Sequence, residues 1–272
     1  MFICKEDTQI LSEERKRYLK SVRRKKIAVN ITKIIILVAF FAVWEIAGQL
    51  KIIDTFIMSS PSRIVKTLIN LYNRGDLFLH IWTTTSETII GFLIGTVLGT
   101  LIAVLLWCSK FLCDVLEPYL VVLNSLPKIA LGPIFIVWIG AGSTAIIVIT
   151  LTISVIVSVL EVLNGFLSTN EEQIRLVQTF GANKMQVLTK VVLPSNITTI
   201  VNSLKINVGM SWVGVIVGEF LVSKAGLGYL IVYGSQVFQL DLVMASVLIL
   251  AVIATLMYQS VLLFEKAVYR KM

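Results

Sequence analysis

Six long apolar segments constrain the fold of this chain more than any other feature. They cover residues 31–50, 88–107, 118–139, 143–163, 204–222 and 242–264. A helix needs about 20 mostly apolar residues to cross a bilayer. Inside hydrocarbon every backbone N–H and C=O must be hydrogen-bonded within the protein, and a single apolar segment of this length achieves that as a helix. The sequence therefore predicts an all-α integral membrane protein with six transmembrane helices.

The composition agrees with a membrane protein and excludes several other classes. The chain is 57% hydrophobic and 15% charged, with a mean hydropathy of +0.89, whereas soluble domains average about 25% charged residues. The net charge of +8 comes from basic residues before or between the apolar segments, so we expect no nucleic acid partner. Cys4, Cys108 and Cys113 fit neither a disulfide framework nor a zinc pattern, so we expect no metal site. Because phosphate-loop and catalytic motifs are missing from the sequence, we expect a protein without catalytic residues that does not hydrolyse ATP itself.

The basic residues also predict how the chain is oriented, because Lys and Arg favour the cytoplasmic side of a membrane. Most of the 24 Lys and Arg residues fall on one side when both termini are cytoplasmic. On this basis residues 1–30 form a basic cytoplasmic segment, and the polar stretch 168–202 also lies in the cytoplasm. The first apolar segment is not followed by a small-residue cleavage site, so we interpret it as a retained span. On the other side, Ser60 and Pro61 predict the start of an amphipathic helix on the outer surface.

The polar stretch 168–202 begins with the signals of a short helix. Thr169 and Glu172 fit the Thr-x-x-Glu capping box, in which each side chain satisfies a backbone N–H at the helix start. They predict a helix over residues 170–180. Gly181 suits the left-handed conformation that often ends a helix, because glycine adopts it without steric cost.

A second helix is expected in the same stretch. Asn183 and Gln186 offer another capping pair, and the helix should end before Pro194, since proline disfavours helical backbone at the preceding residue. Apolar residues and one glycine recur every three or four positions across both helices, at Ile174, Val177, Gly181, Met185, Leu188 and Val192. A second, partial face consists of Phe180, Val187 and Val191. The apolar surface is larger than two short helices need, so we expect it to meet a partner protein. A solvated connector on the membrane surface is the alternative.

Gly181, nine further residues, Val191, one residue and then Leu193-Pro194 form a pattern with fixed spacing. The pattern resembles the signature loop of permease subunits of binding-protein-dependent ABC importers. That signature reads Glu-Ala-Ala, three residues, Gly, nine residues, Ile, one residue and Leu-Pro. Here Arg175-Leu176-Val177 stands in place of Glu-Ala-Ala.

Other motifs resemble the nitrate/sulfonate/taurine branch of the same family. They are Ser59-Ser60-Pro61-Ser62, Glu87 followed by Gly91-Phe92, Leu126–Pro133 followed by Trp138-Ile139-Gly140, and Gly218-Glu219-Phe220 followed by Gly226-Leu227-Gly228. The resemblance covers about residues 30–268. It implies a permease domain over 31–268 with a bundle like that of type I ABC importers.

The resemblance also implies partners, a location and a task. It implies a homodimer of permeases in a bacterial cytoplasmic membrane, two cytoplasmic ATPase subunits that bind ATP and Mg²⁺, and an extracytoplasmic solute-binding protein. This chain would itself bind no cofactor. The stretch 168–202 would be the coupling loop that inserts into a groove on an ATPase. Its candidate residues are Glu172, Arg175, Gly181, Ala182, Met185, Leu188, Leu193 and Pro194.

The expected solute is a sulfonate-, taurine- or nitrate-like anion. Within the same class, the alternative is a riboflavin or thiamine-precursor importer. Outside it, the alternative is a secondary transporter or a membrane scaffold that needs no ATPase.

Polar residues within the apolar segments are candidates for the translocation path. Irregular backbone in a membrane is buried in protein or lines a cavity, and Pro127 and Pro133 interrupt the third segment. The path candidates are Asn124, Ser125 and Lys128 there, and Asn207 and Ser211 in the fifth segment. Lys128 either attracts an anionic solute or pairs with Glu117 or Glu161. Asn207 and Ser211 either face the path or form hydrogen bonds between helices.

Two further sets of residues within the membrane have open roles. Glu219 is either a gate or a structural residue that bonds to the 224–228 loop or to another helix, because an ionised carboxylate at the centre of a membrane helix costs at least about 2.5 kcal/mol without a partner. His80 and Glu87 stand near the outer face, without a third polar partner in the sequence. Gly91, Gly95 and Gly99 recur every four residues and predict close helix packing.

Overall fold

The computed structural model describes residues 3–270, with side chains from Glu14 onward. All regular elements of this part of the chain are helical, which confirms the predicted all-α class. The chain forms two compact units, the first ending at Val65 and the second beginning at Lys66.

The first unit is dominated by α1 (Ile3–Gln49), a helix without interruption. The basic segment and the first apolar segment are therefore parts of one helix. A short helix, α2 (Thr55–Met58), begins at Asp54, whose carboxylate accepts a hydrogen bond from the Phe56 N–H. The next helix, α3 (Pro61–Arg74), begins at the predicted proline and continues into the second unit.

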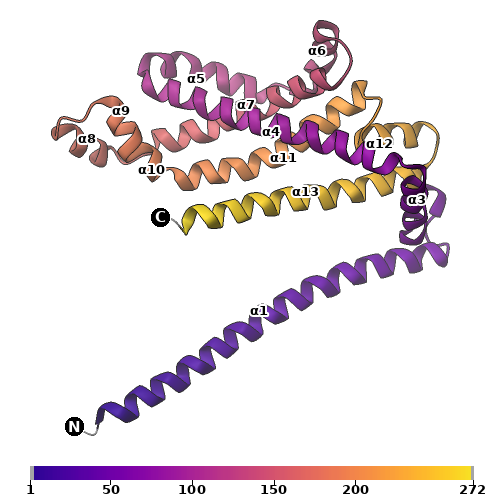
Figure 1. Ribbon diagram of the computed structural model, residues 1–272, viewed down its shortest axis with the longest axis horizontal. Coiled ribbons are helices and arrows are strands. Elements are labelled where there is room, and N and C mark those ends of the chain that lie inside the picture. Colours follow the sequence, from indigo (N-terminus) through magenta and orange to yellow (C-terminus); the bar gives the residue numbers. More distant parts are fainter. Residues whose placement is uncertain (1–2, 271–272) are drawn as a thin grey trace. The chain divides into compact units, whose positions relative to one another are not determined.

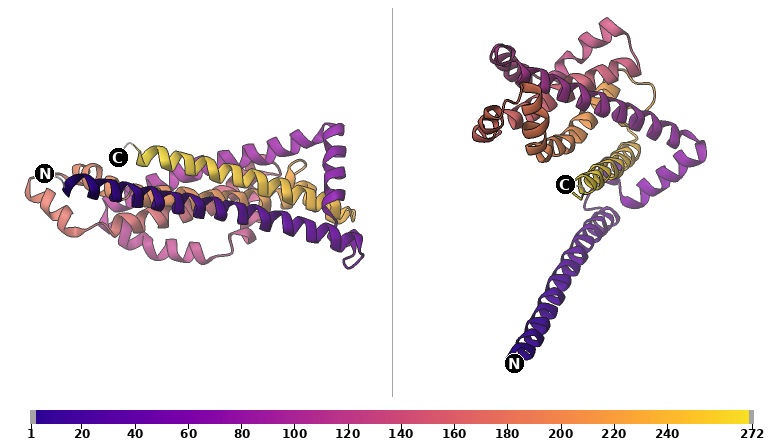
Figure 2. Two further views of the ribbon diagram at one scale, coloured as in Figure 1. Left: turned by 90° about the horizontal axis from the view of Figure 1, so that it is seen from below. Right: turned by 60° about the vertical axis from the view of Figure 1, so that its left-hand side comes forward.

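The second unit is a bundle of long helices (Figure 1). Four of them are long and apolar enough to cross a membrane: α4 (Asp76–Cys108), α7 (Ser143–Leu167), α11 (Ile197–Val222) and α13 (Leu240–Tyr269). With the apolar part of α1 they make five candidate spans in the described chain. Figure 2 shows the same helices from two further directions.

The third predicted segment is not a single straight span. It consists of α5 (Lys110–Ser125) and a second arm made of η1 (Lys128–Leu131) and α6 (Gly132–Ile139), and the two arms are bent by 88°. The break falls at Leu126, whose backbone is extended because it precedes Pro127. Counting this bent pair as one span gives the predicted six.

Helix α7 is the centre of the bundle and packs tightly against α4 and α11. Gly91, Gly95 and Gly99 of α4 face Thr150, Ser154 and Ser158 of α7, so the predicted close packing is confirmed. On the other side of α7, a Cβ added to Gly214 of α11 would lie only 2.7 Å from Thr150 Cα. Small residues at these positions let the helix backbones approach each other.

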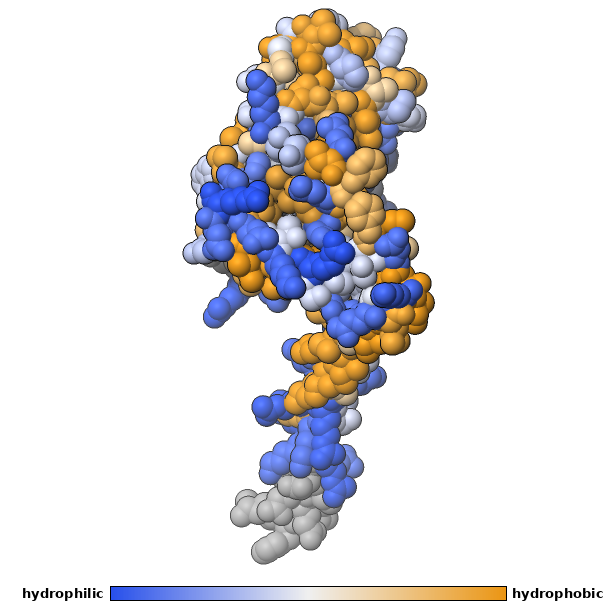
Figure 3. All heavy atoms as spheres, turned by 90° about the vertical axis from the view of Figure 1, so that its right-hand side faces the viewer, coloured by the Kyte–Doolittle hydropathy of each residue, from blue (hydrophilic) through white to orange (hydrophobic). Residues whose placement is uncertain are grey.

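Short elements occupy the two ends of this bundle. One end carries α8 (Glu171–Thr179), α9 (Lys184–Val187), the π-helical turn η2 (Leu188–Val192) and α10 (Leu193–Ser195). The other end carries α12 (Leu227–Gln236), as Figure 1 shows. Viewed toward the α12 end, hydrophilic residues gather among apolar ones (Figure 3). The two ends of the bundle thus carry different short helices.

Candidate coupling site

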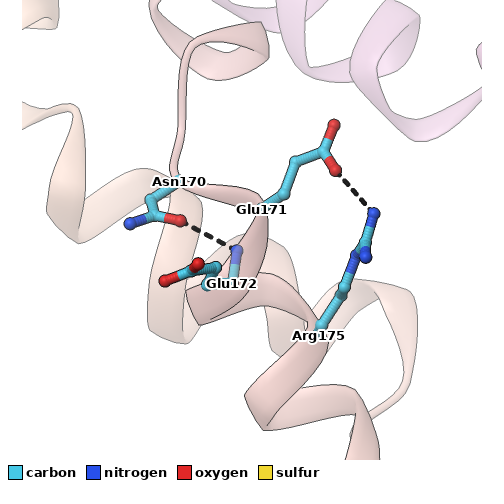
Figure 4. Close-up of polar contacts among 4 residues, drawn as sticks. All are labelled: Asn170, Glu171, Glu172 and Arg175. Atoms are coloured by element: carbon cyan, nitrogen blue, oxygen red, sulfur yellow. Dashed lines mark hydrogen bonds and ion pairs between the residues drawn. The ribbon is translucent and has the colours of Figure 1, made fainter.

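The first helix of the predicted coupling loop, residues 168–202, begins one residue later than its capping pattern predicted. Asn170, and not Thr169, caps α8, because Asn170 Oδ1 accepts a hydrogen bond from the Glu172 N–H at 2.8 Å (Figure 4). The Glu171 carboxylate pairs with the Arg175 guanidinium one turn later, at 2.8 Å. Both side chains of this pair are more than three-quarters exposed, and surface pairs of this kind stabilise a helix only weakly.

The middle of the loop agrees with its sequence signals. Gly181 follows α8 with φ of +84°, the left-handed conformation that glycine adopts without strain. Asn183 and Gln186 form the predicted capping box at the start of α9, with two reciprocal side-chain to backbone hydrogen bonds of 2.8 Å each. Helix, glycine turn and second helix therefore form as expected.

The prediction that the second helix ends before Pro194 is wrong. It continues through η2 into α10, which includes Pro194. A proline inside an α-helix clashes with the carbonyl four residues earlier, here that of Lys190. In a π-helical turn the hydrogen bonds reach five residues, which moves the preceding carbonyls out of this register. The π-helical turn thus accommodates the proline, and sequence periodicity does not reveal it.

The apolar face predicted to run across both helices is divided between two environments. Leu188 and Val192 are 2% and 0% exposed and belong to the protein's own core, so Leu188 supports the loop from within. They pack with Val162, Leu163 and Phe166 of α7 and with Ala103 and Leu106 of α4. Ala182 and Leu193 are partly buried against the same cluster.

Other apolar residues of the loop point outward. Leu176, Phe180 and Met185 are 58%, 83% and 61% exposed, and we call these three residues the exposed turn. Of them, only Met185 belongs to the predicted face. Phe180 belongs to the second, partial face, whose other members Val187 and Val191 are buried.

A buried hydrogen bond closes the base of the loop. Asn196 Nδ2 donates to Thr169 Oγ1 at 2.7 Å and to the Val192 carbonyl oxygen at 2.9 Å. This use of the Thr169 hydroxyl explains why Thr169 does not cap α8. The contact joins residues 27 positions apart, and the periodicity of the sequence contains no signal for it.

The candidates for the translocation path separate into two groups. Asn124 and Ser125 are exposed at the end of α5, and Lys128 begins the second arm of the bent pair. Lys128 Nζ donates to the Asn124 carbonyl oxygen at 2.8 Å and to Asn124 Oδ1 at 3.1 Å. These bonds, within one turn, replace the predicted pairing with Glu117 or Glu161.

Asn207 and Ser211 do not face an open path in this structure. Both are fully buried in α11. Asn207 Nδ2 donates to Thr96 Oγ1 of α4 at 2.7 Å, which is the interhelical hydrogen bond given above as the alternative. The hydrogen bond between helices is thus formed by Asn207, whereas Ser211 Oγ is buried without a hydrogen-bond partner.

Glu219 bonds to the 224–228 segment, which is the structural alternative given above, and it belongs to a polar cluster whose other members the sequence did not reveal. It is 1% exposed, and its Oε2 accepts a hydrogen bond from the Gly228 N–H at 2.6 Å. His80 Nδ1 accepts from the Gly226 N–H at 2.9 Å, and Thr84 Oγ1 accepts from the Leu227 N–H at 2.7 Å. We call His80, Thr84 and Glu219 the α12 cap, because they satisfy the backbone amides at the start of α12, which have no acceptor within the helix.

In the α12 cap, His80 bonds to a backbone amide. His80 and Thr84 lie one turn apart on α4, and this spacing was the available signal. Gly226 has φ of +123°, and a Cβ there would lie 2.5 Å from the Glu219 carboxylate, which explains the glycine. Both oxygens of Glu87 are buried without a hydrogen-bond partner. Within the described residues, no group of three His, Cys, Asp or Glu side chains could hold a metal ion.

Comparison with known proteins identifies the family of the chain. Residues 95–272 match the family of binding-protein-dependent transport system inner membrane components. The chain belongs to this family. It is therefore a multi-pass inner membrane subunit of an ABC importer, a permease. The stretch 168–202 and Glu219 of the α12 cap lie within the matched residues, whereas His80 and Thr84 precede them.

Similar proteins include permeases for different solutes. The putative aliphatic sulfonates transport permease SsuC of Bacillus subtilis is 28% identical, over 83% of this chain and 82% of that protein. The formylaminopyrimidine transport permease ThiX of Halalkalibacterium halodurans is 30% identical, over 69% of this chain and 74% of that protein. A solved bacterial ABC transporter involved in alginate import shares the fold, with a TM-score of 0.63 and 13% identity over 92% of this chain and 99% of that one.

Proposed function

We propose that this permease works as a homodimer in a bacterial cytoplasmic membrane, with its exposed turn docked on a cytoplasmic ABC ATPase that binds ATP and Mg²⁺. A binding protein on the other side would deliver the solute. The observation that carries the proposal is the division of the coupling loop: one apolar face is buried in the core, and the exposed turn stays uncovered. Exposed apolar patches mark protein or membrane contact sites, and Phe180 of the exposed turn is 83% exposed.

The proposed solute is a small organic anion of the sulfonate class. One support is the similarity to the B. subtilis permease named for aliphatic sulfonates. A second is Lys128, a cation on the bent third span. Its ammonium group has three N–H donors, and two of them bond to Asn124. The third is available for an oxygen of an anionic solute. The similarity to a formylaminopyrimidine permease supports a second candidate, a neutral nitrogen heterocycle.

Docking is tested by co-purification of the tagged permease with its ATPase. Phe180→Asp places a charge in the exposed turn, and we expect it to lower ATPase recovery strongly. Phe238→Asp is the matched control, because Phe238 is also exposed, at 70%, but lies at the α12 end. Equal recovery with both variants would contradict docking at the exposed turn, and no recovery with the unmodified chain would favour a secondary transporter or a scaffold.

The solute is tested with the purified binding protein and with uptake. A thermal-shift screen of alkane sulfonates, taurine, nitrate, riboflavin and formylaminopyrimidine should select a sulfonate. Lys128→Gln should raise the solute concentration needed for half-maximal uptake, whereas Lys110→Gln, at an exposed position outside the bend, should not. A neutral heterocycle as the selected ligand would overturn the anion proposal.

A further inference from the structure

The base of the coupling loop joins three segments through one buried side chain. Asn196 directly precedes α11, Thr169 lies just after α7, and Val192 ends the π-helical turn. Asn196 and Thr169 are 6% and 8% exposed. Both N–H bonds of the Asn196 amide are used, one toward Thr169 and the other toward Val192. This arrangement holds the loop by a polar contact in addition to its apolar core.

Next to this contact, α7 and α11 are closely packed. A Cβ added to Gly165 of α7 would lie 2.6 Å from Thr199 Cγ2 and 3.1 Å from Asn196 Oδ1. Further along the same pair of helices, Gly214 contacts the backbone of Thr150. Closely packed interiors transmit displacement because they are hard to compress. The two helices are therefore expected to move as one body.

We infer that Thr169 and Asn196 are positioning residues that transmit a displacement of the exposed turn to α7 and α11 together. The inference rests on the proposed function, since an ATPase must supply the displacement. Without the Thr169–Asn196 bond, the chain ends of the loop would connect separately to the two helices. Part of the displacement would then be absorbed by movement within the loop, and less would reach the α12 end.

The test compares hydrogen–deuterium exchange at the two ends of the bundle. The full complex with its ATPase is measured with and without ATP, Mg²⁺ and vanadate, so no solute has to be known. One reporter is the loop, residues 171–187, and the other is the α12 end, residues 223–239. Thr169→Val keeps the shape of the side chain and removes the acceptor. Thr169→Ser restores an acceptor, and Thr189→Val removes a hydroxyl whose hydrogen bonds are exposed, in the same loop.

In Thr169→Val we expect the nucleotide-dependent change in exchange to remain in the loop. At the α12 end this change should fall about 5-fold or more, since coupling between linked sites is typically at least about 5-fold. Thr169→Ser and Thr189→Val should respond like the unmodified complex. An undiminished α12 response in Thr169→Val overturns the inference, and so does a loss of both responses together, which a purely structural role would cause. If the unmodified complex shows no nucleotide response at either end, the proposed function itself fails.

Discussion

Replacing Gly214 by alanine should force α11 away from α7. The added Cβ would lie 2.7 Å from Thr150 Cα, whereas carbon atoms in contact are normally about 3.5–4.0 Å apart. The helices would have to separate locally by roughly 0.8–1.3 Å. Because the obstacle is backbone, no side-chain rotation relieves it. Overpacking of this kind costs about 1–3 kcal/mol of unfolding free energy.

The measurement needs a control, because alanine is intrinsically the better helix former by about 1 kcal/mol. Gly209→Ala lies in the same helix and meets nothing within 4 Å. It therefore gains the helix propensity without the clash. The difference between the two variants isolates the packing cost. For a chain near this size, each kcal/mol of unfolding free energy shifts the melting temperature by about 2–4 °C. The melting temperature of Gly214→Ala should therefore lie about 2–12 °C below that of Gly209→Ala. Tryptophan fluorescence of the purified protein in detergent measures this difference.

A second substitution distinguishes side-chain clashes from backbone clashes. A Cβ on Gly91 would lie 2.5 Å from Thr150 Cγ2, so Thr150→Ala should restore most of the stability that Gly91→Ala loses. The same substitution should not rescue Gly214→Ala, because Thr150 Cα remains. A double-mutant cycle measures both interactions. Equal melting of Gly214→Ala and Gly209→Ala, or equal rescue of Gly91→Ala and Gly214→Ala, would refute the reasoning.

Three further variants test other parts of the structure. Glu219→Leu should cost about 1–3 kcal/mol of unfolding free energy, because the Gly228 N–H stays buried without its acceptor. Glu219→Gln should retain most of that stability. Equal melting temperatures of the two variants would contradict the α12 cap. Gly181→Val should strain the left-handed turn by about 1–2 kcal/mol, seen as faster proteolysis of the coupling loop with an unchanged melting temperature of the bundle. Asn207→Leu removes the bond to Thr96 and should change the unfolding free energy by only about 0.6 kcal/mol, a typical contribution of one hydrogen bond between membrane helices. Thermal melting checks this, and a severalfold larger loss would show that the bond is a main support of the bundle.

The parts of the fold that were predictable are those governed by local rules. The apolar segments, the start of α3 at Pro61, the turn at Gly181 and the capping box at Asn183 all depend on neighbouring residues. The close packing predicted from the glycine spacing of α4 was also confirmed, because small residues every four positions create a groove in any helix. The break at Leu126 was visible in the proline after it, but the 88° bend was not, since its size depends on what each arm packs against.

The sequence alone determined the membrane class, the long helices and the existence of an ordered loop between the fourth and fifth apolar segments, because hydrophobic length and capping act locally. Only the tertiary structure decided which loop residues face outward. It buried Leu188 and left Phe180 exposed, it used Thr169 to bind Asn196, and it brought His80 and Thr84 to the start of α12. Each of these outcomes depends on contacts between segments far apart in the chain, and periodicity along one segment carries no information about the segment that packs against it.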